Sequence, residues 1–326
     1  MRLILAGDAM LGRGVDERLR RVGPETGLAA LGQLFARGDV AFANLECAVA
    51  GADARYQGAP KAFLFRAAPA TLQTLTSVGV ALVSLANNHA LDAGVDGLRQ
   101  TLRHLAAAGI AAVGAGEDVQ GAWAPGMLER AGTRLGVLAA CDHQADFAAG
   151  RGRPGVAYLD RDDPGARDRL LDAVARLAPR VDHVVVSLHW QPNWVPRVAG
   201  DTRALAHALV AAGARVVWGH SPHHLQGVEW TRGSAVFYGT GSLIDDYALD
   251  PGFRNDRQLL YEVELAAGEV RSVRAHPIEL RYAHTVPAAG EARAWIAARF
   301  AAACAALGSR VDDEGDGLRV VSGSEG

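Results

Sequence analysis

Six short apolar runs in the first two thirds of the chain each end in polar residues that are able to bind a metal or move a proton. The runs are residues 2–6, 40–43, 80–85, 135–140, 183–188 and 215–218. Between them lie amphipathic stretches, such as 98–107, 166–177 and 202–211, with apolar residues three or four positions apart. This alternation predicts an α/β fold with a mainly parallel sheet covered by helices on both faces.

The pattern changes after residue 220. Residues 225–230, 235–238, 259–265 and 270–281 are typical of consecutive, antiparallel strands, and 290–307 of a helix. The acidic, Gly- and Ser-containing segment 311–326 is expected to be a flexible tail. No internal repeat or linker interrupts the rest, so residues 1–310 are predicted to form a single domain.

Composition excludes several classes of protein. The 33 basic and 36 acidic residues give a net charge of −3, which provides no general attraction to nucleic acid or to an anionic membrane. The three cysteines are odd in number and far apart, which argues against a disulfide framework. No apolar run approaches the roughly 20 residues of a membrane span, and the first residues lack a secretory signal. We therefore expect a cytoplasmic protein without a membrane span; its oligomeric state is not predicted.

The polar residues at the strand ends form a set with the chemistry of a metal site. They are Asp8, Glu46, Asn88, His89, His189, His220 and His223. Ligand sites in parallel sheets lie beyond the carboxyl ends of the strands. Imidazole nitrogen with carboxylate and amide oxygen suits Zn, Mn or Fe. Each residue alone has a simpler explanation, such as a helix cap, a turn or a core histidine, but five separate strand ends together favour one shared site for one or two divalent ions.

Five motifs occur in a fixed order along residues 1–285. They are Gly-Asp-Ala-Met-Leu-Gly-Arg (7–13), Asn-Leu-Glu (44–46), Ala-Asn-Asn-His (86–89), Ser-Leu-His-Trp (187–190) and Gly-His-Ser-Pro-His-His-Leu-Gln-Gly-Val-Glu (219–229). A sixth segment, 237–247, closes the series with Phe-Tyr-Gly-Thr-Gly-Ser and Asp-Asp-Tyr. The ordered set resembles the CapA family of capsule and poly-γ-glutamate synthesis proteins, which are similar to calcineurin-like metallophosphoesterases.

This resemblance implies an α/β, metallophosphoesterase-like four-layer sandwich, with two mixed β-sheets flanked by helices and a metal centre at one edge. It implies metal ligands at Asp8, Glu46, Asn88, His189, His220 and His223, with Glu46 as the bridging carboxylate. It also implies that His89 is a general acid near the leaving group. Met10 stands where a histidine ligand is usual, which leaves the number of ions open.

Further candidates surround these residues. Arg13 either faces a substrate anion or is a solvated charge, and Trp190, Asn193 and Trp194 either line a substrate pocket or simply pack. Asp245 and Asp246 are expected to be solvated turn residues, and His224 is expected to point away from the metal. Cysteine–histidine catalysis at Cys141 and His143 is a minor alternative, because nothing nearby marks an activated thiolate.

The functional expectation is a metal-dependent hydrolase that uses metal-activated water. The bond is either a phosphoester or a γ-glutamyl-type amide, in an anionic small molecule or polymer. The alternatives are a non-catalytic, metal-binding accessory factor in capsule or poly-γ-glutamate synthesis, and a carbohydrate- or peptide-binding module.

Overall fold

Two mixed β-sheets lie face to face in the computed structural model, which describes residues 1–323. The larger sheet has the order β19-β20-β17-β16-β1-β2-β5-β6, with β15 beside β1 and β18 beside β17. Its strands are β1 (Arg2–Ala9), β2 (Val40–Leu45), β5 (Val80–Ser84), β6 (Ala111–Val113), β15 (Ser242–Ile244), β16 (Arg257–Ala266), β17 (Glu269–Arg281), β18 (His284–Pro287), β19 (Ser309–Asp313) and β20 (Leu318–Ser322). β1, β2, β5 and β6 run parallel, whereas β16 joins β1 antiparallel.

The smaller sheet has the order β13-β14-β12-β11-β9-β8. Its strands are β8 (Gly126–Arg130), β9 (Thr133–Cys141), β11 (His183–His189), β12 (Ala214–His220), β13 (Val228–Thr231) and β14 (Ser234–Phe237). The four central strands are parallel, and β8 and β13 close the edges antiparallel. Two short ladders lie apart from these sheets, β3 (Ala48–Val49) with β4 (Arg66–Ala67) and β7 (Ala115–Gly116) with β10 (Gly155–Val156).

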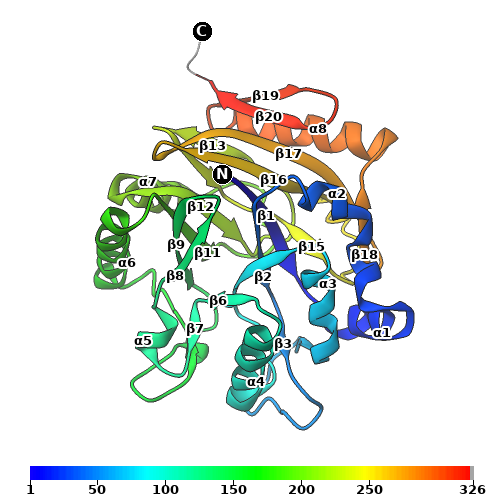
Figure 1. Ribbon diagram of the computed structural model, residues 1–326, viewed down its shortest axis with the longest axis vertical. Helices are drawn as coiled ribbons and strands as arrows, with labels where there is room; N and C mark the ends of the chain where they lie inside the picture. Colours follow the sequence, from blue (N-terminus) through cyan, green and yellow to red (C-terminus); the bar gives the residue numbers. More distant parts are fainter. Residues whose placement is uncertain (324–326) are drawn as a thin grey trace.

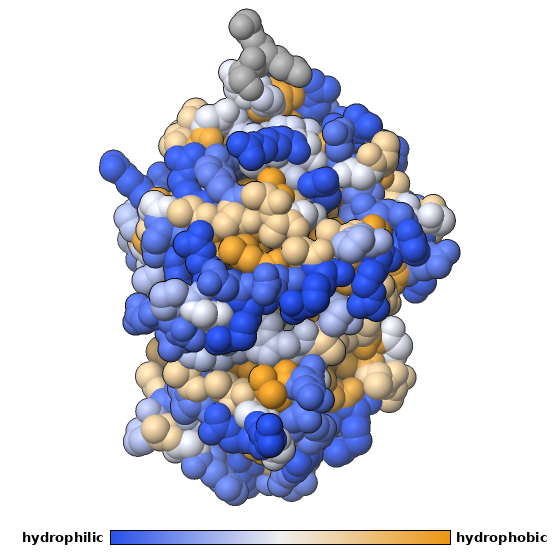
Figure 2. Space-filling view, turned by 90° about the vertical axis from the view of Figure 1, so that its left-hand side faces the viewer, coloured by the Kyte–Doolittle hydropathy of each residue, from blue (hydrophilic) through white to orange (hydrophobic). Residues whose placement is uncertain are grey.

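Helices cover the outer face of each sheet (Figure 1). The larger sheet is covered by α1 (Arg13–Val22), α2 (Gly32–Phe35), α3 (Gln73–Thr76) and α4 (Gly94–Ala107), and the smaller by α6 (Pro164–Leu177) and α7 (Gly200–Ala212). The remaining helices are α5 (Val119–Ala122) and α8 (Gly290–Ala305), with short 3₁₀ turns at Pro24–Gly27, Ala29–Leu31, Pro69–Leu72, Ala145–Phe147 and Ala178–Arg180. The side that bears α6 and α7 is mainly hydrophilic (Figure 2), as expected for amphipathic helices whose apolar stripe faces a sheet.

Side-chain alternation explains how the two sheets share one core. In β1, Leu3 and Leu5 face the second sheet, whereas Ile4 and Ala6 face the outer helices. The indole of Trp218 reaches across the interface and donates to the Ala6 carbonyl oxygen at 3.1 Å. The four-layer α/β sandwich implied by the resemblance is confirmed, and the single parallel sheet expected from strand pattern alone is wrong, because that pattern does not assign strands to sheets.

The C-terminal segment corrects another expectation. Residues 311–326 were expected to form a flexible tail, but β19 and β20 pair with each other, and β20 pairs with β17. Leu318 and Val320 are buried between the sheets. Their burial stabilises the two strands although the residues around them are mostly polar or acidic. Residues 324–326 lie outside the described part, and the assignment of residues 1–310 to a single domain stays a prediction.

The central strands and main helices expected from sequence are confirmed to within a few residues. Within residues 1–323, none of the helices is both long enough and apolar enough to cross a bilayer.

Candidate metal centre

His189 and His220 end two neighbouring parallel strands of the smaller sheet. They are direct partners across β11 and β12, so both side chains leave the sheet on the same face. Val185 and Val216 share that face and are buried against the larger sheet. The Nδ1 atoms of the two rings are 3.0 Å apart, and Ser187 Oγ lies 2.7 Å from His220 Nε2, which turns Nδ1 of His220 toward the larger sheet.

Asp8 brings a carboxylate from the larger sheet to these rings. The pairing of β1 with β2 shifts register between Leu5 and Asp8, and such an irregularity re-aims a side chain. Asp8 Oδ1 accepts a hydrogen bond from Asn44 Nδ2 at 2.8 Å and lies 3.9 Å from His220 Nδ1. Gly7 is required here, because an added Cβ would lie 2.0 Å from the Gly241 carbonyl oxygen.

Glu46 and His223 complete the cluster. His223 Nδ1 is 3.2 Å from Asp8 Oδ2 and 3.7 Å from Glu46 Oε2, and Glu46 Oε1 is 3.6 Å from His189 Nε2. Two groups of three side chains have the spacing to hold an ion, namely Asp8 with His189 and His220, and Asp8 with Glu46 and His223. Asp8 belongs to both groups. The two oxygens of Glu46 lie near one residue of each group, His189 and His223. The bridging role of Glu46 therefore stays a prediction.

Several buried polar atoms at this point have no hydrogen-bond partner among residues 1–323. They are both carboxylate oxygens of Glu46, Nδ1 of His223 and Oδ1 of Asn88, the residue that follows the Asn87 amide at the end of β5. Leaving a buried acceptor unsatisfied costs about 1–3 kcal/mol, and more when it is charged. These donor atoms are a mixture of nitrogen and oxygen that divalent transition ions accept. The residues present therefore fit a bound divalent cation.

Burial dominates the electrostatics of the cluster. It raises the pKa of Glu46 well above its ordinary value and lowers the pKa of His220 to about 4, with Asp8 opposing the latter shift. Burial, followed by the neighbouring His220, lowers the pKa of His189 well below its ordinary value. Both rings are therefore neutral, which is the form that ligates a metal. Burial also disfavours protonation of His223, but Glu46 and Asp8 outweigh it and raise its pKa to about 9.

Met10 does not join the cluster. Its side chain is fully buried in the core beneath α1, and its sulfur accepts a hydrogen bond from the Gly12 N–H at 3.2 Å. Met10, which stands where the resemblance leads one to expect a histidine, therefore supplies no ligand to the cluster.

His89 lies beside this cluster in a network that sequence reasoning missed. Its Nδ1 is 2.5 Å from Asp92 Oδ2. Lys61 Nζ donates to Asp92 Oδ1 at 2.5 Å and also to the Asn88 carbonyl oxygen. The Phe65 ring stacks on the imidazole with centroids 4.0 Å apart. Burial lowers the pKa of His89, with Asp92 opposing the shift. Two sequence signals were available, since Asp92 follows His89 by three residues and Lys61 is the only lysine in the chain.

A cavity of about 310 Å³ opens beside His89 and His223. Its wall contains Arg13, Asn193 and four aromatic rings, those of Phe63, Phe65, Trp194 and Tyr247. The Arg13 guanidinium lies 5.1 Å from the Phe65 centroid and forms a bidentate ion pair with Asp246 at 2.5 and 3.2 Å. Arg13 is therefore neither free nor fully solvated, and Asp246 is its partner rather than a solvated turn residue.

Trp190 does not line this cavity, and of the two alternatives for this residue the structure shows packing. It is 2% exposed, packs in the core beneath α6 and α7, stacks on Tyr238 and donates to the Tyr238 carbonyl oxygen at 2.8 Å. The reason is the strand period, because the residue after His189 must leave the sheet on the opposite face. Asn193 and Trp194, farther along the loop, do line the cavity.

The remaining candidates take structural positions. Asp245 is buried rather than solvated, and burial raises its pKa to about 6. Burial raises the pKa of the Cys141 thiol well above its ordinary value, and its sulfur contacts the backbone of His143 rather than the ring, so no activated thiolate forms. His224 turns away from the cluster toward the Val195 carbonyl oxygen.

Comparison with known proteins places these residues in a family. The family model described as bacterial capsule synthesis protein PGA_cap matches residues 2–247. A probable polyglutamine synthesis accessory protein of Mycobacterium tuberculosis is 33% identical, over 85% of this chain and 84% of the relative. The capsule biosynthesis protein CapA of Bacillus anthracis is 29% identical, over 75% of this chain and 59% of its own length. A hypothetical protein from Thermus thermophilus shares the fold, with a TM-score of 0.50 and 20% identity over 86% of this chain and 99% of that one. The chain belongs to the bacterial capsule synthesis protein PGA_cap family, as the CapA resemblance predicted.

Proposed function

We propose that this protein is a metal-dependent hydrolase that cleaves a phosphoester or a γ-glutamyl-type bond in an anionic substrate. The observation that carries the proposal is the set of unpaired buried atoms of Glu46, Asn88 and His223 around Asp8, beside the neutral rings of His189 and His220. One or two divalent ions of Mn, Zn or Fe, held by these six residues, would supply Lewis acidity toward water and toward an anionic oxygen of the substrate.

His89 is the proton donor in this proposal. Asp92 holds Nδ1, which leaves Nε2 as the ring nitrogen without a hydrogen-bond partner among residues 1–323. Asp92 thereby fixes the ring orientation, and Phe65 stacked on one face restricts rotation. His89 lines the cavity that would receive the leaving group, and Asp92 favours the protonated ring that a proton donor needs, against the effect of burial, which lowers the pKa of His89.

The His89→Asn variant tests the proposed role. We expect its metal content to match that of the wild type, while turnover falls about 10²–10⁴-fold, the usual range for a general acid or base. The loss should shrink for a nitrophenyl ester, whose leaving group needs no proton. His220→Ala is the matched comparison, because it should lower metal content and turnover together. Loss of metal in His89→Asn would make His89 a ligand and refute its role as proton donor.

A non-catalytic accessory role is the second candidate, favoured by the description of the M. tuberculosis relative as an accessory protein. It predicts a protein that binds metal but releases no product from nitrophenyl phosphoesters or from γ-glutamyl amides at any metal loading. Chelator-sensitive product release from either substrate class would exclude it.

The proposal includes a cytoplasmic location. The three cysteines are all buried and unpaired, which suits a reducing compartment. Recovery of the native protein from the culture medium or the membrane pellet would contradict this location.

A further inference from the structure

The hydroxyl of Tyr247 is a buried polar group beside the metal centre that none of the roles described above uses. The residue lines the cavity of about 310 Å³ together with His89 and His223. Its phenol oxygen is buried and has no hydrogen-bond partner among residues 1–323. Buried hydroxyls in native proteins are normally paired, so an unpaired one next to a cavity indicates a missing ligand.

Packing holds the Tyr247 ring in one orientation. The Tyr247 N–H donates to Asp245 Oδ1 at 3.1 Å, and the Phe65 ring lies 5.8 Å from the phenol ring between centroids. The Arg13 guanidinium is 5.8 Å from the centroid of the phenol ring and is itself fixed by Asp246. The direction of the hydroxyl is therefore set by the fold.

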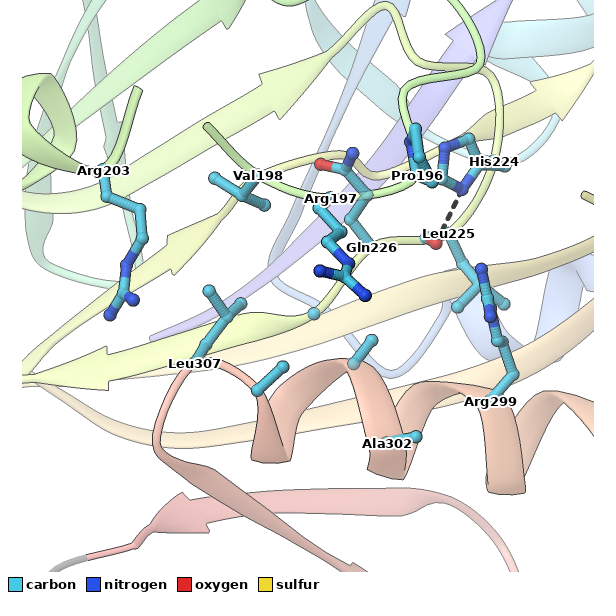
Figure 3. Close-up of a pocket in the computed structure, with 13 residues that line it drawn as sticks. Pro196, Arg197, Val198, Arg203, His224, Leu225, Gln226, Arg299, Ala302 and Leu307 are labelled. Atoms are coloured by element: carbon cyan, nitrogen blue, oxygen red, sulfur yellow. Dashed lines mark hydrogen bonds between the residues drawn. The ribbon is translucent and has the colours of Figure 1, made fainter. Parts of the chain in front are cut away.

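The imidazole beside Tyr247 is fixed as well. The His223 ring lies 5.1 Å from the phenol ring at an interplanar angle of 75°, and the His223 carbonyl oxygen accepts from Gln258 Nε2 at 2.9 Å. The next residue, His224, lines a separate cavity of about 490 Å³, where its Nδ1 is 3.0 Å from the Leu225 carbonyl oxygen (Figure 3). His223 thus stays against Tyr247, and the His224 ring is engaged elsewhere.

The hydroxyl of Tyr247 acts as a donor that lacks an acceptor. Burial raises the pKa of Tyr247 well above its ordinary value, and the neighbouring carboxylates raise it further, so the oxygen keeps its proton. The nearest of these charges, those of Glu46 and Asp245, form no hydrogen bond with it within the described part of the chain. An oxygen brought in by a ligand would supply the acceptor.

We propose that Tyr247 is a substrate-binding residue whose O–H donates a hydrogen bond to an anionic oxygen of the group bound at the metal centre. A hydrogen bond of this kind, from a neutral donor to a charged acceptor, is stronger than one between neutral groups. The Arg13 guanidinium on the same wall adds positive charge close to that oxygen. Only the identification of the bound group as the one that is hydrolysed rests on the proposed function.

The test is isothermal titration calorimetry of inorganic phosphate into the zinc-loaded, full-length protein, with Tyr247→Phe as the test variant. Tyr261→Phe is the matched control, because the Tyr261 hydroxyl is equally buried and unpaired within residues 1–323 but lies between the sheets. Tyr238→Phe is the second control, because it removes a hydroxyl that donates to Glu229 Oε2 at 2.5 Å. The melting temperatures of the metal-free proteins are measured in parallel.

We expect Tyr247→Phe to weaken phosphate binding about ten- to a hundredfold, the usual effect of losing a hydrogen bond to a charged group. Its zinc content should match that of the wild type. Its melting temperature should not fall, because the hydroxyl that it loses has no partner in the protein. Tyr261→Phe should leave phosphate affinity within about twofold of wild type and should not lower the melting temperature either. Tyr238→Phe should lower the melting temperature and leave phosphate affinity unchanged.

Unchanged phosphate affinity in Tyr247→Phe, equal weakening in Tyr261→Phe, or no phosphate binding by the wild type would overturn the proposal. So would a melting temperature that falls in Tyr247→Phe as far as in Tyr238→Phe, since the hydroxyl would then have a structural partner. Weaker phosphate binding in Tyr247→Phe, with no turnover by the wild type, would refute the hydrolase proposal and support this one. Unchanged phosphate affinity with normal turnover would do the opposite.

Discussion

Replacing Glu46 by glutamine removes a carboxyl group whose ionised form is disfavoured by burial, which raises its pKa, and keeps the shape of the side chain. Glu46 is fully buried, and within the described part of the chain neither of its oxygens has a hydrogen-bond partner. With Asp8 it places two carboxylates beside one imidazolium, that of His223, whose pKa they raise to about 9 against the effect of burial. With glutamine at position 46, the Asp8 carboxylate and the His223 imidazolium would remain as one pair of opposite charges. We therefore expect Glu46→Gln to stabilise the metal-free protein and to reduce the stabilisation that added metal provides.

The magnitude follows from the charge, because glutamine leaves a polar but neutral group in the same place. An unpaired buried group costs about 1–3 kcal/mol and a charged one more, so we take a difference of the same order. For a 326-residue chain, an unfolding entropy of about 2.1 cal/mol/K per residue converts 1 kcal/mol into roughly 1.5 °C of melting temperature. The metal-free Glu46→Gln protein should thus melt about 2–4 °C above the metal-free wild type.

Thermal unfolding followed by circular dichroism, after chelator dialysis and again after adding Mn²⁺ or Zn²⁺, measures both effects. Glu262→Gln is the control, because Glu262 is buried but paired with Arg37 at 2.9 Å and His276 at 3.2 Å. It should lower the melting temperature whether or not metal is present. If Glu46→Gln destabilises the metal-free protein as Glu262→Gln does, then Glu46 has partners in solution and the reasoning is wrong.

Three further outcomes are expected. Leu318→Ala should lower the free energy of unfolding in urea by about 2–4 kcal/mol, because Leu318 is buried between the sheets, whereas Arg319→Ala beside it should change it little. Because burial raises the pKa of its thiol, Cys141 should react with iodoacetamide at pH 8 far more slowly in the native protein than in urea, as measured by mass spectrometry; comparable rates would contradict its burial. Trp190→Phe should lower the melting temperature and leave KM for a cleaved substrate unchanged. Trp194→Ala should raise KM and leave the melting temperature nearly unchanged. A raised KM in Trp190→Phe would indicate that Trp190 contacts the substrate.

The strands and main helices could be predicted from sequence because both faces of each central strand are buried and each helix has one apolar stripe. The positions of Asp8, His189 and His220 followed from the same pattern, since each stands at the carboxyl end of a parallel strand. The division of the strands between two sheets did not follow, because it depends on long-range pairing that leaves no local pattern.

Three features of the site were beyond the strand pattern. The irregularity in β1 that turns Asp8 toward the second sheet has no sequence signature. The contact of Lys61 with Asp92 joins segments 31 residues apart and exists only after both loops have folded over His89. The packing of Trp190, by contrast, could have been predicted from the sequence, because strict alternation after His189 sends its side chain to the opposite face of the sheet.

The most direct test of the central claim is the metal content per chain, measured by elemental analysis of the purified protein after incubation with divalent ions and removal of the excess. The claim that Asp8, Glu46, Asn88, His189, His220 and His223 form a metal centre predicts at least one tightly held Mn, Zn or Fe ion per chain in the wild type. It also predicts loss of that ion in Asp8→Ala and in His220→Ala, and its retention in His143→Ala, a nearby histidine outside the cluster. A wild type that retains no ion, or the same metal content in all four proteins, would contradict it.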